Sequence, residues 1–302
     1  MLFTDFADAW QVYLQAGPRL PAAPAAVTPQ RVKGLVDVLD RYQVLAFDAY
    51  GVLHCGDQAF PQAVRAVALA RQAGKSVCVL TNDVTREPAA VAAGLRLRGF
   101  DFSASEVISG RTLLPKVLRE AMSPGQVFGV ISSVPEDVLT TLPDFALRPL
   151  GREPEQFDAV DGFLFIDNNH WEDGDDHRLE RALVRRPRPL IVCNPDVGCP
   201  FLGRMSAEPG YYAHRIAGHG SVEPLFLGKP FPAVYEALCQ RFPDVSPAQI
   251  LMIGDSPHTD VLGSRSAGLD CLLVESGFLS GQDSQRCCQE SGLWPDWIAP
   301  FV

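Results

Sequence analysis

The sequence predicts an α/β protein in which a parallel sheet core is interrupted by a second, inserted α/β unit. Short apolar runs alternate with amphipathic helical segments, which is the pattern of strand, helix and parallel strand units. This pattern occurs in residues 42–122 and again in residues 221–302. The residues between, 123–220, carry further apolar runs and need a core of their own. We therefore expect one core domain, split in sequence by an insertion.

The first half of the core follows an N-terminal helical extension, residues 1–41, that includes a Pro/Ala-rich connector. Proline at a helix start and glycine just after a helix end mark the boundaries of the elements in this half. The expected elements are a strand at 44–47, a helix at 61–73, a strand at 76–80 and a helix at 87–98.

The second half of the core and the insertion show the same alternation. In the second half, helices are expected at 231–241 and 258–267, and buried strands at 250–253 and 269–274. In the insertion, the apolar runs at 127–131, 162–166 and 190–193 are expected to form strands.

Charge and composition disfavour several classes of function. The 302 residues include 26 Lys and Arg against 36 Asp and Glu, and this net charge of −10 disfavours nucleic acid as a partner. The sequence has no apolar run of about 18 to 20 residues and no signal-peptide start, so we expect a cytoplasmic protein with no membrane partner. The eight cysteines match no zinc spacing and are expected to be free thiols. Walker A and G-x-G-x-x-G motifs are absent.

Polar residues follow three of the predicted core strands. Asp48 follows the first, Thr81 and Asn82 follow the second, and Asp255 follows the third. Ligands of open parallel sheets bind outside the carboxyl ends of the strands, so these side chains are expected to share one crevice. Lys229, just ahead of a predicted helix, adds a positive charge. Each residue alone is an ordinary turn former, but together they indicate a site.

Four motifs, in this order, resemble those of the haloacid dehalogenase-like (HAD) hydrolases. They are Phe47-Asp48-Ala49-Tyr50-Gly51-Val52-Leu53, Thr81-Asn82, Gly228-Lys229-Pro230 and Gly254-Asp255-Ser256-Pro257-His258-Thr259-Asp260. The long gap between the second and third motifs resembles class IIA of that superfamily, which carries an α/β cap domain there. Cys193-Asn194-Pro195-Asp196 resembles its sugar- and nucleotide-phosphatase (NagD-like) branch. The resemblance implies a Rossmann-like parallel sheet core with an α/β cap domain at residues 123–220.

The resemblance also implies a Mg²⁺-dependent phosphatase for a small phosphorylated metabolite. Asp48 would be the nucleophile, because a carboxylate can attack phosphorus and form an aspartyl phosphate. Mg²⁺ prefers hard oxygen ligands, and the resemblance assigns these to Asp48, Asp255 and the main-chain carbonyl of Tyr50. Asp260 would position the loop of the fourth motif or the water molecules bound to the metal ion.

The same resemblance assigns the phosphate-binding groups. Thr81, the amide of Asn82 at the start of a helix, and the Lys229 ammonium would bind the non-bridging phosphate oxygens. Lys229 would in addition stabilise charge in the transition state. The substrate stays open, because in capped enzymes residues of the cap select it. The oligomeric state, with a homodimer as one option, is open too.

Tyr50 departs from the pattern of the superfamily. Phosphatases of this superfamily usually carry a second Asp there, two residues after the nucleophile, as general acid and base. A phenol with an ordinary pKa near 10 exchanges its proton poorly at neutral pH, and losing such a group typically costs about 10²- to 10⁴-fold in rate. Weak activity on alkyl phosphates is therefore expected. Gly51-Val52-Leu53-His54 resembles a branch with an aromatic residue at this position.

Two alternatives stay open. The segment Phe47-Asp48-Ala49-Tyr50-Gly51 also resembles metal-free 2-haloacid dehalogenases, in which an Asp displaces halide from carbon. Without a cation, however, three carboxylates in one crevice would raise at least one pKa and weaken the nucleophile. The other alternative is a ligand-binding or regulatory homologue with little turnover, which the missing acid favours.

Two further groups of residues in the insertion, one acidic and one aromatic, give less support for a functional role. The acidic stretch from Asp167 to Asp176 fits no EF-hand spacing and is predicted to be a solvated loop. Tyr211, Tyr212 and His214 are candidates for substrate contact by analogy alone.

Overall fold

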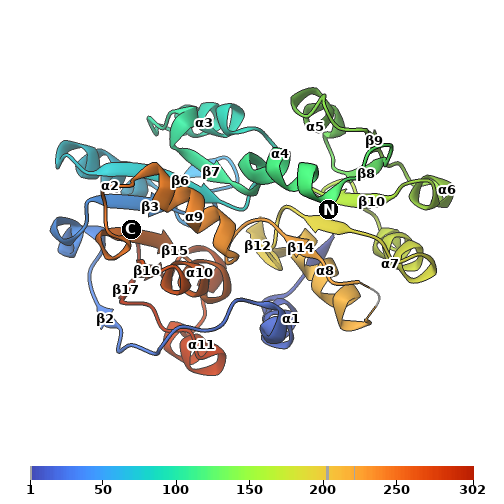
Figure 1. Ribbon diagram of the computed structural model, residues 1–302. Coiled ribbons are helices and arrows are strands. Elements are labelled where there is room, and N and C mark those ends of the chain that lie inside the picture. Colours follow the sequence, from blue (N-terminus) through green and yellow to red (C-terminus); the bar gives the residue numbers. More distant parts are fainter. Residues whose placement is uncertain (1, 202–203, 221) are drawn as a thin grey trace.

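The computed structural model describes residues 2–201, 204–220 and 222–302. These residues form two parallel sheets, one in each half of the molecule (Figure 1). The core sheet has the strand order β2-β17-β16-β15-β3-β6-β7, and the cap sheet has the order β14-β11-β10-β8-β9. A third, antiparallel sheet has the order β1-β13-β12. The predicted α/β class, with a parallel core and an α/β cap, is confirmed.

The strands are short, and most residues of the central ones are apolar. The core sheet contains β2 (Gln30–Arg31), β3 (Val44–Phe47), β6 (Ser76–Thr81), β7 (Val107–Ser109), β15 (Ile250–Gly254), β16 (Asp270–Val274) and β17 (Trp297–Ala299). The cap sheet contains β8 (Phe128–Ile131), β9 (Leu147–Pro149), β10 (Gly162–Phe165), β11 (Leu190–Val192) and β14 (Leu225–Phe226). The other strands are β1 (Phe3–Thr4), β12 (Gly198–Phe201), β13 (Arg204–Ala207) and the hairpin strands β4 (His54–Cys55) and β5 (Gln58–Ala59).

The helices follow the predicted pattern, and proline occupies the first turn of many of them. They are α1 (Phe6–Ala16), α2 (Pro61–Gln72), α3 (Pro88–Leu97), α4 (Gly110–Ala121), α5 (Pro135–Thr141), α6 (Pro154–Asp158), α7 (Asp175–Arg185), α8 (Pro209–Gly218), α9 (Pro232–Arg241), α10 (Leu262–Ser266) and α11 (Ser284–Ser291).

Both faces of the core sheet are buried. In β3, Val44 and Ala46 belong to the apolar cluster that includes Val234 of α9. Leu45 and Phe47 point to the other face and belong to the cluster that includes residues of α2 and α3. A strand buried on both faces has no place for polar side chains except at its ends, and this directs the polar residues to the carboxyl edge.

The structure extends the cap sheet and the N-terminal segment beyond the expected limits. β14 pairs with β11 in the cap sheet, although β14 lies after residue 220, where the inserted unit was predicted to end. The N-terminal segment is not only helical, because β1 pairs with β13 and β2 pairs with β17 of the core sheet. The two ends of this segment thus attach to different sheets.

The helix predicted at 258–267 is present, but its first turn is not α-helical. Pro257–Val261 forms a π-helical turn, and α10 begins only at Leu262. At this turn, Asp260 Oδ2 accepts hydrogen bonds from the amides of Asp255 (3.0 Å) and Ser256 (3.1 Å). Turns of this kind often occur at functional sites.

Two expectations from composition can be compared with the structure. Across the described residues, no helix combines the length and apolar character needed to cross a membrane. The cysteines are free thiols, as expected, and Cys78, Cys193, Cys271, Cys287 and Cys288 are buried.

Candidate active site

The strand ends of the core sheet bring the predicted residues together. β3 lies between β15 and β6, and Phe47 pairs with Ile253 on one side and with Val79 on the other. The Asp48 amide continues the ladder by donating to the carbonyl of Ile253 at 2.8 Å. Asp48, Thr81 and Asp255 therefore emerge from the same edge, as the sequence predicted.

Three buried carboxylates meet one ammonium at this edge. Oxygens of Asp48, Asp255 and Asp260 all lie within 4.8 Å of one another. Lys229 Nζ lies 2.6 Å from Asp48 Oδ1 and 2.7 Å from Asp260 Oδ1. Lys229 is 2% exposed and Asp260 0% exposed, so solvent screens these charges little.

The pKa values of these groups reflect first their burial and then the charges of their neighbours. Burial raises the pKa of Asp48 to about 7, against the opposing effect of Lys229. Burial, followed by the charges of Asp48 and Asp260, raises the pKa of Asp255 well above its usual range. Burial alone would lower the pKa of Lys229, but Asp260 and Asp48 outweigh it and hold this pKa above its usual range. The site would therefore gain from a further cation.

Backbone geometry fixes the position of Asp255. Its Oδ2 accepts a hydrogen bond from the amide of Phe278 at 2.7 Å. Gly51 and Gly277 have φ values of +87° and +67°, and a Cβ on either residue would come within 1.9 Å of Asp255 Oδ2. Both loops thus need glycine for close approach to the carboxylate as well as for their left-handed conformation.

Thr81 and Asn82 lie in the site, but Asn82 does not begin a helix. The helix α3 starts at Pro88, so the expected helix N-terminus at the Asn82 amide is wrong. The Asn82 side chain connects Lys229 to Asp196 through hydrogen bonds. Its Nδ2 donates to the Lys229 carbonyl (3.0 Å) and to Asp196 Oδ1 (2.8 Å), and its Oδ1 accepts from the Lys229 amide (2.7 Å).

Two further residues line the same cavity, although neither was predicted to have a role in the site. Asp196 comes from the loop after β11 on the cap side, and Tyr13 comes from α1. Burial raises the pKa of Asp196 to about 7, against the effect of Lys229. The Cys193-Asn194-Pro195-Asp196 motif was a signal for Asp196, whereas nothing local in the sequence around Tyr13 indicates a site.

Tyr50 lies two residues after Asp48 in the same loop and lines the cavity, and its hydroxyl is next to a thiol. Cys55 Sγ donates to the Tyr50 hydroxyl at 3.8 Å, and the ring packs edge-on against His54 at 5.4 Å. Burial, and then Cys199, raise the pKa of the Tyr50 phenol above its usual range. Tyr50 is thus an even weaker proton donor here than a free phenol.

The cavity above the carboxylates has a volume of about 330 Å³ and is lined from both sheets. The core contributes Asp48, Thr81 and Asp255, and the cap side contributes Asp196 and Glu208. The acidic stretch predicted to be a solvated loop contributes too: Asp167 lines the cavity and is 3% exposed, so that expectation is wrong for this residue. Tyr211, Tyr212 and His214 are not among the described lining residues of this cavity.

The donor set fits a hard divalent cation. Asp48, Asp255 and Asp260 offer carboxylate oxygens within one small volume, which is the ligand chemistry that Mg²⁺ prefers. Three negative charges against the one positive charge of Lys229 leave a net charge for such an ion to balance.

Family models match both halves of the core. The haloacid dehalogenase-like hydrolase model matches residues 45–142, and the HAD-hydrolase-like model matches residues 226–301. A glycerol-3-phosphate phosphatase from Gallus gallus is 29% identical over 292 residues, which cover 88% of this chain and 91% of that protein.

Solved structures agree with this fold. A possible sugar phosphatase of the HAD superfamily from Cytophaga hutchinsonii superposes with a TM-score of 0.78 at 22% identity, covering 91% of this chain and 98% of its own. A glycerol phosphate phosphatase from Mycobacterium tuberculosis in complex with magnesium has a TM-score of 0.62 at 24% identity and covers 78% and 68%. The motifs, the fold and the family matches together show that the chain belongs to the haloacid dehalogenase-like hydrolases.

Proposed function

We propose that this protein is a Mg²⁺-dependent phosphatase of the NagD-like branch that hydrolyses a small phosphorylated metabolite through an aspartyl phosphate on Asp48. The observation that carries the proposal is the Lys229 ammonium between Asp48 and Asp260, with Asp255 beside them. Of these residues, Asp48 and Asp255 line the cavity. The named relatives support it, because the Gallus gallus protein is a phosphatase for glycerol 3-phosphate.

The residues divide the chemistry between them. Asp48 attacks phosphorus, and its ionised form is favoured by the Lys229 ammonium 2.6 Å away. Asp48, Asp255 and the Tyr50 carbonyl would hold Mg²⁺, with Asp260 beside them. When bound, the ion neutralises charge on the phosphoryl oxygens. Lys229 and the Thr81 hydroxyl bind these oxygens, and Lys229 stabilises the charge that develops on them in the transition state.

The group at the usual acid position is an inefficient proton donor for the leaving group. Tyr50 stands where phosphatases of the superfamily carry their acid, and burial raises its pKa above the usual range of a phenol. An alkoxide leaving group needs a proton in the transition state, whereas a nitrophenolate leaves without one. We therefore infer slow turnover of alkyl phosphates and faster turnover of aryl phosphates.

We also propose that residues 123–220, together with β14, form the cap domain that selects the substrate. Its support is that the cap side supplies Asp196, Asn194 and Glu208 to the cavity, across from Asp48. A covered site excludes water and allows the cap to contact the part of the substrate beyond the phosphate.

The test is a kinetic screen of the purified protein on 4-nitrophenyl phosphate and on glycerol 3-phosphate, each with Mg²⁺ and with EDTA. Halide release from 2-chloropropionate is measured in parallel. We expect Mg²⁺-dependent phosphate release, fastest from the aryl ester and abolished in Asp48→Asn. Halide release without Mg²⁺ would favour the dehalogenase alternative. Absence of turnover on all substrates would favour the ligand-binding alternative.

A further inference from the structure

The N-terminal helix α1 lies between the core and the cap side (Figure 1). On the cap side, the Tyr211 hydroxyl of α8 donates to Asp8 Oδ2, and β1 pairs with β13. On the core side, Trp10 Nε1 donates to Glu290 at 3.0 Å, and the Trp10 ring packs edge-on against His258 at 4.7 Å. The helix thus connects the two halves that enclose the cavity.

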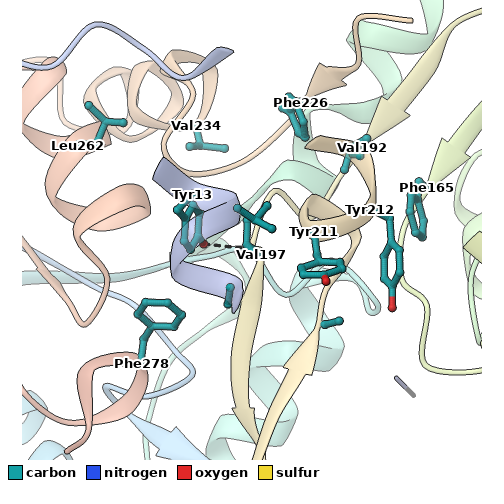
Figure 2. Close-up of a cluster of buried hydrophobic side chains, with 14 of the residues drawn as sticks. Tyr13, Phe165, Val192, Val197, Tyr211, Tyr212, Phe226, Val234, Leu262 and Phe278 are labelled. Atoms are coloured by element: carbon teal, nitrogen blue, oxygen red, sulfur yellow. Dashed lines mark hydrogen bonds between the residues drawn. The ribbon is translucent and has the colours of Figure 1, made fainter. Parts of the chain in front are cut away.

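Tyr13 is the point at which this helix reaches the cavity. Its ring stacks on His258 with centroids 4.5 Å apart and an interplanar angle of 1°, and it meets Phe278 edge-on at 5.8 Å. Both partners belong to the core loops around Asp255. The Tyr13 hydroxyl accepts a hydrogen bond from the Val197 amide of the cap side at 3.1 Å (Figure 2). Tyr13 is 2% exposed, so water competes little for this bond.

The bond reaches the loop that carries Asp196. Asp196 and Val197 are neighbours in the loop after β11, and both are anchored to other parts of the chain. The Asp196 carboxylate accepts from Asn82 of the core, and the Val197 amide donates to Tyr13 of α1. Within the cap side, the Glu208 amide donates to the Val197 carbonyl at 3.1 Å and the Gly210 amide donates to the Asp196 carbonyl at 3.0 Å. The bonds to Asn82 and Tyr13 are the ones that connect this loop to the core and to α1, beside the cavity that contains Asp48.

We propose that Tyr13 is a positioning residue of the active site, whose hydroxyl holds the Asp196–Val197 loop of the cap side over the nucleophile. The inference rests on the proposed function and adds a third structural part, the N-terminal helix, to a site otherwise built from core and cap. Without the Tyr13 bond, Asn82 alone of these two contacts still connects the loop to the part of the site outside the cap side, so the loop can shift relative to Asp48. A misplacement of about 1 Å is enough to slow an enzyme substantially.

Tyr13→Phe tests this directly, because it removes the hydroxyl and keeps the ring that stacks on His258. The matched control is Tyr211→Phe, which removes another hydroxyl between the N-terminal segment and the cap side but at a residue that does not line the cavity. The two readouts are kcat and KM for 4-nitrophenyl phosphate with Mg²⁺, and hydrogen exchange at the Val197 amide. Melting temperatures establish that both variants are folded at the assay temperature.

For Tyr13→Phe we expect kcat/KM to fall about tenfold, mainly through KM, and the Val197 amide to exchange at least about tenfold faster. For Tyr211→Phe we expect both quantities to stay within about twofold of the natural protein. Unchanged exchange at Val197, or equal kinetic losses in both variants, would overturn the proposal. Exchange needs no turnover, so an inactive natural protein would refute the proposed function and still leave the role of Tyr13 tested.

Discussion

The two parallel sheets place an aspartate in similar positions and give it different surroundings. Asp48 follows β3 of the core sheet, and Asp167 follows β10 of the cap sheet. Asp167 accepts from the Ser132 hydroxyl at 2.8 Å and from the Ser133 and Asn169 amides. Asp48 accepts from the Ala49 amide at 2.7 Å and pairs with Lys229, but it shares Lys229 with Asp260.

This comparison shows that an aspartate at a strand end is not in itself a site. Neutral donors of the chain itself satisfy the Asp167 carboxylate, so it stabilises the loops around it. Asp48 lies among carboxylates whose repulsion opposes folding, and a buried arrangement of that kind is retained where it serves function. The balance of charge and hydrogen bonds, rather than position, distinguishes the two residues.

The largest expected effect is the contrast between Asp48→Asn and Asp167→Asn. Asp48→Asn should reduce phosphatase activity more than about 10⁴-fold, because an amide cannot form the acyl phosphate. Asp167→Asn should keep activity within about tenfold but lose about 1 to 3 kcal/mol of stability, because one of its two acceptor oxygens becomes an NH₂ group that faces buried donors. Steady-state kinetics and urea unfolding of both variants measure this. A reversed pattern would refute the comparison.

The next effect concerns Tyr50. Tyr50→Asp places a carboxyl group where the superfamily has its acid, so glycerol 3-phosphate turnover should rise by up to about 10²- to 10⁴-fold. Turnover of 4-nitrophenyl phosphate should rise least, because its leaving group needs little protonation. Tyr50→Asn is the control for the loss of the ring. Equal gains in both variants would show that space, and not proton transfer, limits the natural protein.

Mg²⁺ should stabilise the folded protein by balancing the three carboxylates. At a hundredfold excess over its Kd, an ion that binds only the folded state adds about 2.7 kcal/mol to the free energy of unfolding. Thermal unfolding of the natural protein and Asp255→Asn, with and without Mg²⁺, measures this increment. The increment should shrink in Asp255→Asn, and an equal increment in both proteins would place the ion elsewhere.

The smallest effect is a pH dependence of stability in EDTA. The pKa of Asp48 in the folded protein, about 7, lies above its value in the unfolded chain. Protonation then favours the folded state, so this contribution is complete below about pH 4 and is lost as the pH rises to about 7. Relative to Asp48→Asn, the natural protein should therefore lose stability over this window. Urea midpoints of both proteins at several pH values would show a constant difference if the argument is wrong.

Local sequence was sufficient for the core and for most of the site. Apolar strands followed directly by Asp48, Thr81 and Asp255 must place these residues on one edge, since parallel strands share their direction. A helix was predicted at 258–267, but the π-helical form of its first turn was not. Helix propensity does not show the bonds of the Asp260 side chain to the Asp255 and Ser256 amides.

Contacts between distant segments account for what sequence reasoning missed. Tyr13 lies 184 positions from Val197, and its neighbours in α1 show only an ordinary amphipathic pattern. The bond of the Asn82 side chain to Asp196, 114 positions away, was likewise not predicted, while phosphate binding by the Asn82 amide stays a prediction. Such pairings depend on how the two sheets are packed, which no local pattern specifies.

The most direct test of the central claim is to identify the covalent intermediate. The protein is mixed with 4-nitrophenyl phosphate and Mg²⁺, quenched in acid within the first turnover, digested, and its peptides are measured by mass spectrometry. We predict a phosphoryl group on Asp48 that hydroxylamine removes and that is absent in Asp48→Asn. Phosphate release with Asp48 unmodified, or with the phosphoryl group on another side chain, would contradict the account.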